Sequence, residues 1–244
     1  MSLPQHREAE YHRNPYRREI EIWVDTLGEH PRFGQYLLFS DSIFHPHGGG
    51  QKGDRGLLHL GGEVAEALGC PSDLPLTDTR RENRDNLHVL GSALDNERAH
   101  QHLVGSRLFR LTLDWEFRYR QMRLHSAAHL LHCFVERVLG NSIPFPETSD
   151  LQPEYGLNRY ETKGLLMEEQ VREAEQQLNL FTAEGHAIST SADPEKEGFR
   201  YWHCEDWIIP CGGTHLRNTN EIGEVRVSLG LKRGRTSLTF TLTD

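Results

Sequence analysis

The sequence predicts an α+β protein with two domains, residues 1–118 and 119–244. A chain of 244 residues can bury two modest hydrophobic cores. Short strand-like segments separated by glycine and proline fill residues 19–115, and strongly periodic helices appear only after them. A run of strands with segregated helices favours antiparallel sheets covered on one face. We therefore expect a small N-terminal β-barrel with a glycine-rich loop, followed by an antiparallel α/β two-layer sandwich.

The N-terminal domain is expected to consist of strands of four to eight residues, several of which alternate apolar and polar side chains. Strands this short and this closely spaced are typical of a small barrel or a sandwich. The expected strands are Ile20–Val24, Tyr36–Phe39, Leu57–Leu60, Leu87–Leu90 and Leu108–Trp115.

The loop Phe44–Gly56 has the most unusual composition in the chain. Gly48, Gly50 and Gly53 satisfy the spacing G-x-G-x-x-G, but a short strand rather than a helix is expected to follow, which argues against a dinucleotide site. No Lys-Ser or Lys-Thr pair follows the glycines, so the loop is not a P-loop. Either the backbone passes close to a ligand here, or the loop is only a tight turn.

The second domain is expected to begin with a long helix that includes residues 123–140 and starts near residue 119. Gly140 can end this helix in a left-handed conformation. His125, His129 and His132 share a second face, about a quarter turn from the apolar stripe, which places them at the edge of a core. The stripe consists of Leu124, Ala128, Leu131, Val135 and Val138, at steps of three and four residues.

The remaining chain is expected to add a second helix and four strands. Residues 141–160 are rich in proline, serine and acidic side chains without periodicity, so we expect a long loop there. A helix over residues 163–179 carries an apolar face that would cover a sheet. The expected strands are residues 187–190, 199–202, 224–229 and 237–242.

Two pairs of side chains have the spacing of metal ligands. His125 and His129 are four residues apart, as are Cys211 and His215 in the segment Pro210-Cys-Gly-Gly-Thr-His215. Imidazole and thiolate are the donors that zinc favours, and two such pairs would complete a tetrahedron. His125, His129, Cys211 and His215 are therefore the expected Zn²⁺ ligands.

Other arrangements of donors remain open. His129 and Cys133 are also four residues apart, and His203 with Cys204 adds two donors, so a local site is an alternative, as is no metal at all. We expect His132 to pair with Glu136 on the helix surface. Ser126 follows His125, so the helix lacks the glutamate of an H-E-x-x-H protease.

Composition limits the class of protein. A net charge of −9 argues against unspecific coating of nucleic acid. No apolar run approaches the length of a membrane span, and the first residues lack the apolar core of a signal peptide, so we expect no membrane partner and a cytoplasmic location. Four scattered cysteines do not suggest a disulfide framework.

Taken together, these segments resemble the editing domain of alanyl-tRNA synthetase and its free-standing AlaX-type relatives. The resemblance is carried by the segment from His125 to His132, by Pro210–His215 followed by Thr219–Gly223, and by the glycine-rich loop. Asp78–Arg80 and Asp114–Trp115 fall where related segments would. No aminoacylation segment is recognisable, so the resemblance is to the free-standing members with an added N-terminal barrel.

The resemblance implies a hydrolase that removes the wrong amino acid, mainly serine and in some members glycine, from mischarged alanine tRNA. By analogy His125, His129, Cys211 and His215 would hold zinc at the reacting ester. Gly48, Gly49, Gly50 and Gln51 would border the pocket for the acceptor end of the tRNA, and Thr214 would contact the substrate. Two alternatives remain: a zinc-braced RNA-binding module without catalysis, and a metal-dependent hydrolase of a small ester or amide.

Overall fold

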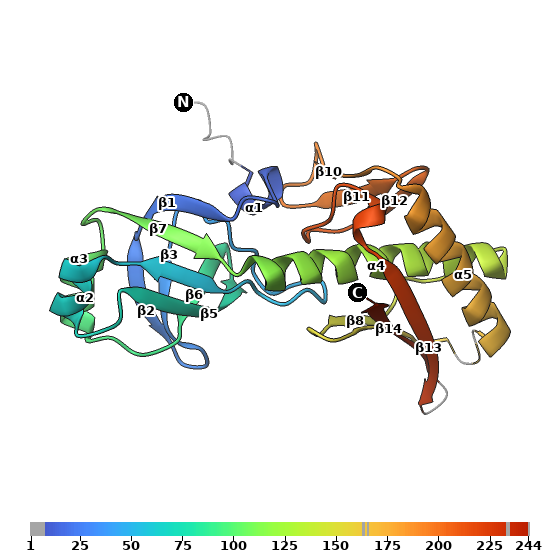
Figure 1. Cartoon of the computed structure of the whole chain (residues 1–244), viewed down its shortest axis with the longest axis horizontal. Helices are drawn as coiled ribbons and strands as arrows, with labels where there is room; N and C mark the ends of the chain where they lie inside the picture. Colours follow the sequence, from blue (N-terminus) through green and yellow to red (C-terminus); the bar gives the residue numbers. More distant parts are fainter. Residues whose placement is uncertain (1–7, 163, 165, 233–234, 244) are drawn as a thin grey trace. The chain divides into compact units, whose positions relative to one another are not determined.

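The computed structural model describes residues 8–162, 164, 166–232 and 235–243. They form two compact units, drawn with their helices and strands labelled in Figure 1. The first unit comprises the residues up to Gly48 together with Lys52–Arg118. The second comprises Gly49–Gln51 together with the residues from Tyr119 onward. Both units combine helices with antiparallel strands, which confirms the expected α+β class.

The first unit is built on a seven-stranded sheet with the order β1-β7-β4-β5-β6-β3-β2. Every neighbouring pair of these strands is antiparallel. Two of the strands, β2 and β5, were not expected from the sequence. The strands are β1 (Glu19–Trp23), β2 (Thr26–His30), β3 (Gly34–Leu38), β4 (Gly56–His59), β5 (Asp73–Glu82), β6 (Asp85–Leu90) and β7 (Leu108–Leu113).

This sheet must curl, because its two outermost strands are neighbours in the chain. A flat sheet of this width would separate β1 from β2 by about 29 Å. Only Val24 and Asp25 connect them, and that connection spans at most about 11 Å. The sheet is therefore a curled half-barrel. Its pairing order ends at β1 and β2 in the described residues, so a closed barrel is not confirmed.

The concave side of the sheet encloses the first core. Phe109, Leu111 and Leu113 alternate inward along β7, as the two-residue period requires. The Asp54 carboxylate and the Arg118 guanidinium form a fully buried ion pair beside this core. The described part of the unit also contains helices that were not expected from the sequence: α1 (Glu10–Arg13), α2 (Gly62–Leu68) and α3 (Asn96–Leu103).

The long helix α4 (Trp115–Leu139) starts earlier than residue 119. The reason is a cap: the Asp114 carboxylate accepts a hydrogen bond from the backbone N–H of Phe117 at 3.1 Å, which satisfies one donor of the first turn. Gly140 has φ of 68°, so the expected left-handed end of the helix is confirmed.

In the second unit α4 contacts two sheets. The centroid of its His129 ring lies 5.3 Å from that of Trp202, which belongs to the sheet β10-β11-β12. The backbone carbonyl of Ala128 accepts a hydrogen bond from the Asn158 amide of the sheet β13-β14-β9-β8 at 3.1 Å. The elements of this unit are β8 (Thr148–Leu151), β9 (Gly156–Tyr160), α5 (Glu168–Glu184), β10 (Ile188–Ala192), β11 (Arg200–Cys204), β12 (Trp207–Pro210), the 3-10 turn η1 (Thr219–Glu221), β13 (Glu224–Lys232) and β14 (Arg235–Thr243).

The expectation of a long loop over residues 141–160 is wrong, because β8 and β9 form a hairpin there. The inward positions of β9 are Gly156, Asn158 and Tyr160, so the strand has no apolar alternation to recognise. Gly156 is needed because a Cβ there would collide with the Phe240 ring of β14.

The second helix is also displaced from its expected range. The expected start at Lys163 lies outside the described residues, and α5 begins at Glu168. The helix continues past Asn179 to Glu184, where Gly185 ends it with φ of 81°. The last turns include buried Thr182, which packs inward although its side chain is polar.

Candidate metal centre

Helix α4 presents His125 and His129 one turn apart toward the interior of the second unit. The apolar stripe predicted for this helix is buried at Leu124, Ala128 and Leu131. Burial of the stripe turns the neighbouring histidine face of α4 inward. His125 on that face is only 3% exposed. The two imidazole rings lie 4.9 Å apart.

The loop 211–215 brings the other two donors to the same place. The backbone N–H of Cys211 donates to the Arg200 carbonyl at 2.9 Å, which anchors the loop to β11. The backbone N–H of Gly213 donates to the Cys211 sulfur at 3.4 Å, so the chain bends around that sulfur. This bend brings the His215 ring close to the His125 ring, with 4.3 Å between the ring centroids.

The four predicted ligands converge. Cys211 Sγ lies 3.4 Å from His125 Nε2 and 3.2 Å from His215 Nε2. One donor atom from each of His125, His129, Cys211 and His215 can be chosen so that all four lie within 4.8 Å of one another. Zinc bonds of about 2.0 to 2.3 Å place tetrahedral ligands about 3.3 to 3.6 Å apart. The two separations from Cys211 Sγ lie near this edge length, so the cluster is compatible with a zinc ion.

Side chains behind the ligands orient two of the imidazoles. His125 Nδ1 lies 3.0 Å from Gln51 Oε1, and His215 Nδ1 lies 3.2 Å from Ser126 Oγ. Each of these contacts occupies Nδ1 and leaves Nε2 facing Cys211. Such outer contacts are typical of metal-bound histidine.

The electrostatic environment suits neutral ligands. Burial lowers the pKa of His125 to about 4 and holds the pKa of His129 well below its usual value. Both imidazoles are therefore neutral near pH 7 and have a lone pair to offer. Burial raises the pKa of the Cys211 thiol to about 11, so a bound cation would have to displace the thiol proton.

His129 Nε2 gives a further sign that the cluster binds something. It is buried, and it has no hydrogen-bond partner among the described residues. A buried polar atom without a partner is costly, which makes such atoms rare in folded proteins. A metal ion among the four donors would satisfy it.

The alternative donor sets do not form a cluster. Within the described residues, the four predicted ligands are the only His, Cys, Asp or Glu group able to converge on one ion. Cys133 and Cys204 are buried free thiols. His203 Nε2 instead lies 2.8 Å from Ser191 Oγ.

His132 is buried rather than on the helix surface, so that part of the expectation is wrong. Its Nε2 lies 3.8 Å from the Glu136 carboxylate, the predicted partner, and its Nδ1 lies 3.3 Å from the Tyr160 hydroxyl. Tyr160 comes from β9, which the sequence did not reveal as a strand. The burial of His132 follows from this unforeseen strand.

The residues predicted to bind substrate divide between the units. Gly48 clusters with the first unit, whereas Gly49, Gly50 and Gln51 cluster with the second. The Gly50 carbonyl accepts a hydrogen bond from the Leu151 N–H at 3.0 Å, and a Cβ at Gly50 would collide with the Ser149 backbone. The loop is thus more than a tight turn, because at Gly50 its backbone approaches β8 too closely for any side chain.

Gln51 and Thr214 lie directly behind the ligands, and both are buried. Gln51 Nε2 donates to Thr214 Oγ1 at 2.8 Å, and Gln51 Oε1 accepts from the Thr214 N–H at 3.0 Å. Thr214 is therefore held beside Gly213 in the ligand loop.

Two residues at the cluster were not found from the sequence. Ser126 follows a ligand directly, and spacing alone cannot indicate that its hydroxyl reaches His215. Trp202 is fully buried against the His129 ring, and its Nε1 has no hydrogen-bond partner among the described residues. Its strand position gives no hint of this contact, which depends on how β11 packs on α4.

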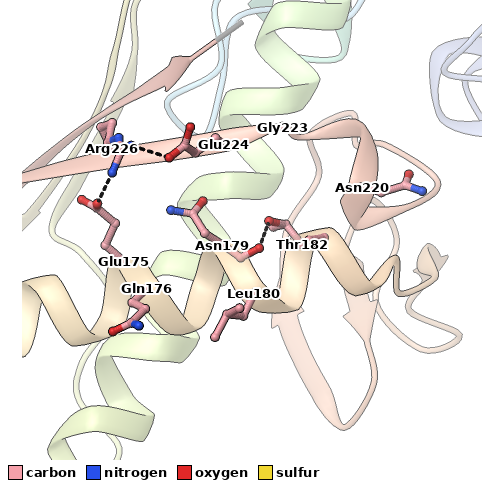
Figure 2. Close-up of a pocket in the computed structure, with 10 residues that line it drawn as sticks. Glu175, Gln176, Asn179, Leu180, Thr182, Asn220, Gly223, Glu224 and Arg226 are labelled. Carbon is pink, nitrogen blue, oxygen red and sulfur yellow. Dashed lines mark hydrogen bonds and ion pairs between the residues drawn. The ribbon is translucent and has the colours of Figure 1, made fainter.

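A separate surface pocket of about 560 Å³ lies between α5 and β13 (Figure 2). Its walls include Glu175, Asn179 and Arg226, and none of the four metal-ligand candidates lines it. The pocket is therefore separate from the candidate metal centre. Among the helices that the structure describes, none is long and apolar enough to cross a membrane.

Comparison with known proteins finds relatives of this chain. Residues 200–237, which contain the Cys211–His215 loop, match the family described as threonyl and alanyl tRNA synthetase second additional domain. The chain is 28% identical to an alanine–tRNA ligase of Metallosphaera sedula and 30% identical to one of Saccharolobus islandicus. Each alignment covers 90% of this chain and 24% of the ligase.

A shorter relative is similar over more of its length. The alanyl-tRNA editing protein AlaX-L of Pyrococcus horikoshii is 26% identical over 248 aligned residues, which cover 93% of this chain and 55% of that protein. The chain thus spans about a quarter of the ligases and about half of AlaX-L. The similarity extends through both units, and it confirms the resemblance of this chain to the editing domain of alanyl-tRNA synthetase and to AlaX-type editing proteins.

Proposed function

We propose that the chain is a trans-editing hydrolase that deacylates mischarged alanine tRNA, carrying serine or glycine, by zinc-dependent hydrolysis of the aminoacyl ester. The observation that carries the proposal is the convergence of His125, His129, Cys211 and His215 within 4.8 Å. Similarity to AlaX-L gives the substrate class. Residues 119–244 would form the editing domain, completed by the glycine loop, and residues 1–118 would form the second domain.

The ligands would act as a preset cage. A zinc ion held by these residues would supply a Lewis acid for the ester carbonyl and would lower the pKa of water toward about 7. Gln51 and Ser126 hold the His125 and His215 rings so that Nε2 of each faces Cys211 Sγ. Because these rings are already oriented, little reorganisation is needed when substrate arrives.

Selection would depend on the pocket beside this cage. We place Gly48, Gly49 and Gly50 along the acceptor end of the tRNA, with the backbone of Gly50 packed against β8. Thr214 remains the candidate contact for the amino acid. A polar group that a serine hydroxyl satisfies and an alanine methyl does not would cost about 1–3 kcal/mol when left unpaired, about ten- to a hundredfold in rate.

The test is a panel of alanine tRNAs charged with serine, glycine or alanine. We expect release of serine or glycine, with alanyl-tRNA largely spared, and loss of turnover in Cys211→Ala and His125→Ala. His203→Ala is the matched control, since His203 bonds Ser191 outside the cluster. Full hydrolysis by both ligand variants would overturn the zinc-centred proposal.

One observation favours a second candidate, a zinc-braced RNA-binding module. Four protein ligands are typical of structural zinc sites, whereas catalytic sites usually keep a position open. The same panel separates the candidates. Binding of alanine tRNA without turnover would support the module, and turnover of small esters without turnover of tRNA would indicate a different hydrolase.

A further inference from the structure

The side chain of Gln51 reaches a proposed metal ligand from a distant part of the sequence. It is completely buried in the second unit. Three contacts hold its amide: Oε1 to the backbone N–H of Thr214 at 3.0 Å, Oε1 to His125 Nδ1 at 3.0 Å, and Nε2 to Thr214 Oγ1 at 2.8 Å. Both the oxygen and the nitrogen of the amide therefore have partners at the ligand cluster.

These contacts fix the chemistry of His125. A backbone N–H can only donate, so the atom of Gln51 that faces the Thr214 N–H must be the oxygen. The same oxygen faces His125 Nδ1, and this contact is a hydrogen bond only if Nδ1 carries the proton. The lone pair of the neutral ring is then on Nε2, the atom that lies 3.4 Å from Cys211 Sγ.

The surrounding backbone leaves Gln51 little freedom. A Cβ at Gly213 would collide with the His125 ring and would approach Gln51 Oε1 to 2.9 Å, so this glycine lets the ligand loop close on both. On the other side, the hydrogen bond between the Gly50 carbonyl and Leu151 fixes the glycine loop on β8. The Gln51 side chain is therefore held between the ligand loop and the glycine loop.

We propose that Gln51 is a positioning residue that sets the tautomer and orientation of His125, so that the metal centre depends on the glycine loop although all four ligands lie between residues 125 and 215. The inference rests on the proposed zinc site, but not on hydrolysis. It assigns Gln51 to the ligand cage rather than to the acceptor-end pocket.

The test measures zinc affinity of the full chain, by competition with a chromophoric chelator, in wild type, Gln51→Met and Gln51→Glu. Gln51→Met keeps the length of the side chain and removes the acceptor, so we expect zinc affinity to fall about 10- to 100-fold. Gln51→Glu restores an acceptor toward both Thr214 N–H and His125 Nδ1, so we expect it to recover most of that loss. Ser149→Ala is the control: Ser149 packs against Gly50 but bonds Asn158 rather than a ligand.

A second readout uses Co²⁺ in place of zinc. A misoriented His125 should alter the visible absorption of the Co²⁺ form in Gln51→Met and leave it unchanged in Ser149→Ala. Wild-type zinc affinity and an unchanged Co²⁺ spectrum in Gln51→Met, with a raised KM for tRNA, would overturn the inference and return Gln51 to substrate binding. Failure of the wild type to bind zinc would instead overturn the proposed site itself.

Discussion

Gly212 and Gly213 are neighbours in the ligand loop, yet only Gly212 has room for a side chain. A Cβ at Gly212 would meet nothing within 4 Å, whereas one at Gly213 would collide with the His125 imidazole. The position of His125 therefore depends on the absence of a single carbon atom. This is a steric requirement of the site rather than a conformational one, because φ at Gly213 is not in the left-handed region.

We expect Gly213→Ala to weaken zinc binding and deacylation by at least about tenfold, because the added methyl displaces a ligand ring. Gly212→Ala should retain both within about twofold, by the same steric argument. Chelator competition and single-turnover deacylation measure the two effects. Equal behaviour of the two variants would contradict the steric account.

His88 is a fully buried histidine of the first unit, outside the candidate metal centre. Its Nδ1 donates to the Leu37 carbonyl at 3.2 Å, its Nε2 lies 2.8 Å from Ser42 Oγ, and its ring lies 4.6 Å from Phe39. Burial lowers the pKa of His88 from 6.5 to about 4. The unfolded chain therefore binds a proton at a higher pH than the folded chain does.

The contribution of neutral, buried His88 to the free energy of unfolding is fully present above pH 6.5. It is lost as the pH falls from 6.5 toward about 4. Because only the unfolded state binds this proton in that window, the free energy of unfolding falls by about 3 kcal/mol at most. We expect His88→Gln to unfold more easily at pH 7.5 but to lose less stability between pH 6.5 and 4. Urea unfolding at several pH values checks this, and parallel pH profiles for the two proteins would contradict it.

At the scale of elements, helix α5 covers an otherwise open sheet edge. Strand β13 is outermost in its sheet, so the outer backbone groups of Val225 and Val227 need partners. The Asn179 amide donates to the Val225 carbonyl and accepts from its N–H, both at 2.8 Å. The Glu175 carboxylate accepts from the Val227 N–H at 2.6 Å. Two side chains of a helix thus replace a neighbouring strand, at the wall of the pocket in Figure 2.

We expect Asn179→Leu to destabilise the second unit by about 1–3 kcal/mol, because two buried backbone groups lose their partners. Gln176→Ala, in the same pocket wall, is the control and should change stability by less than about 0.5 kcal/mol. Urea unfolding followed by circular dichroism gives both values. A large loss in Gln176→Ala would show that the helix surface, rather than the edge contacts, carries the stability.

At the scale of the whole molecule, the chain is divided between two units in an order that differs from its sequence. Gly49–Gln51 cluster with the second unit, while residues on both sides of them cluster with the first. The proposed ligands all belong to the second unit, so metal binding should stabilise that unit together with this short loop.

We expect removal of zinc by a chelator to reduce hydrogen-exchange protection in α4 beyond Tyr119, in the loop 211–215 and at Gly50 and Gln51. Strands β5 and β6, whose residues belong to the first unit, should keep their protection. Exchange followed by mass spectrometry, with and without zinc, checks this. Loss of protection in β5 and β6 with none at Gln51 would contradict the assignment of the loop to the metal centre.

The sequence alone determined the features that depend on local periodicity and donor spacing. The apolar stripe of α4 and its end at Gly140 could be predicted because 3.6-residue periodicity and glycine in a left-handed cap act within a few residues. The pairs His125 with His129 and Cys211 with His215 could be singled out because four-residue spacing brings each pair within reach of one ion.

The tertiary structure decided everything that depends on contacts between distant segments. Strand β9 was missed because its inward positions are Gly156, Asn158 and Tyr160, which satisfy neighbours rather than an apolar pattern. The curl of the first sheet follows from the pairing of β1 with β7, far along the chain, while β2 pairs with its neighbour β3 at the opposite edge. The role of Gln51 follows from contacts 74 and 163 residues away. Periodicity describes a segment relative to its own axis, and only packing decides which side chains of different segments meet.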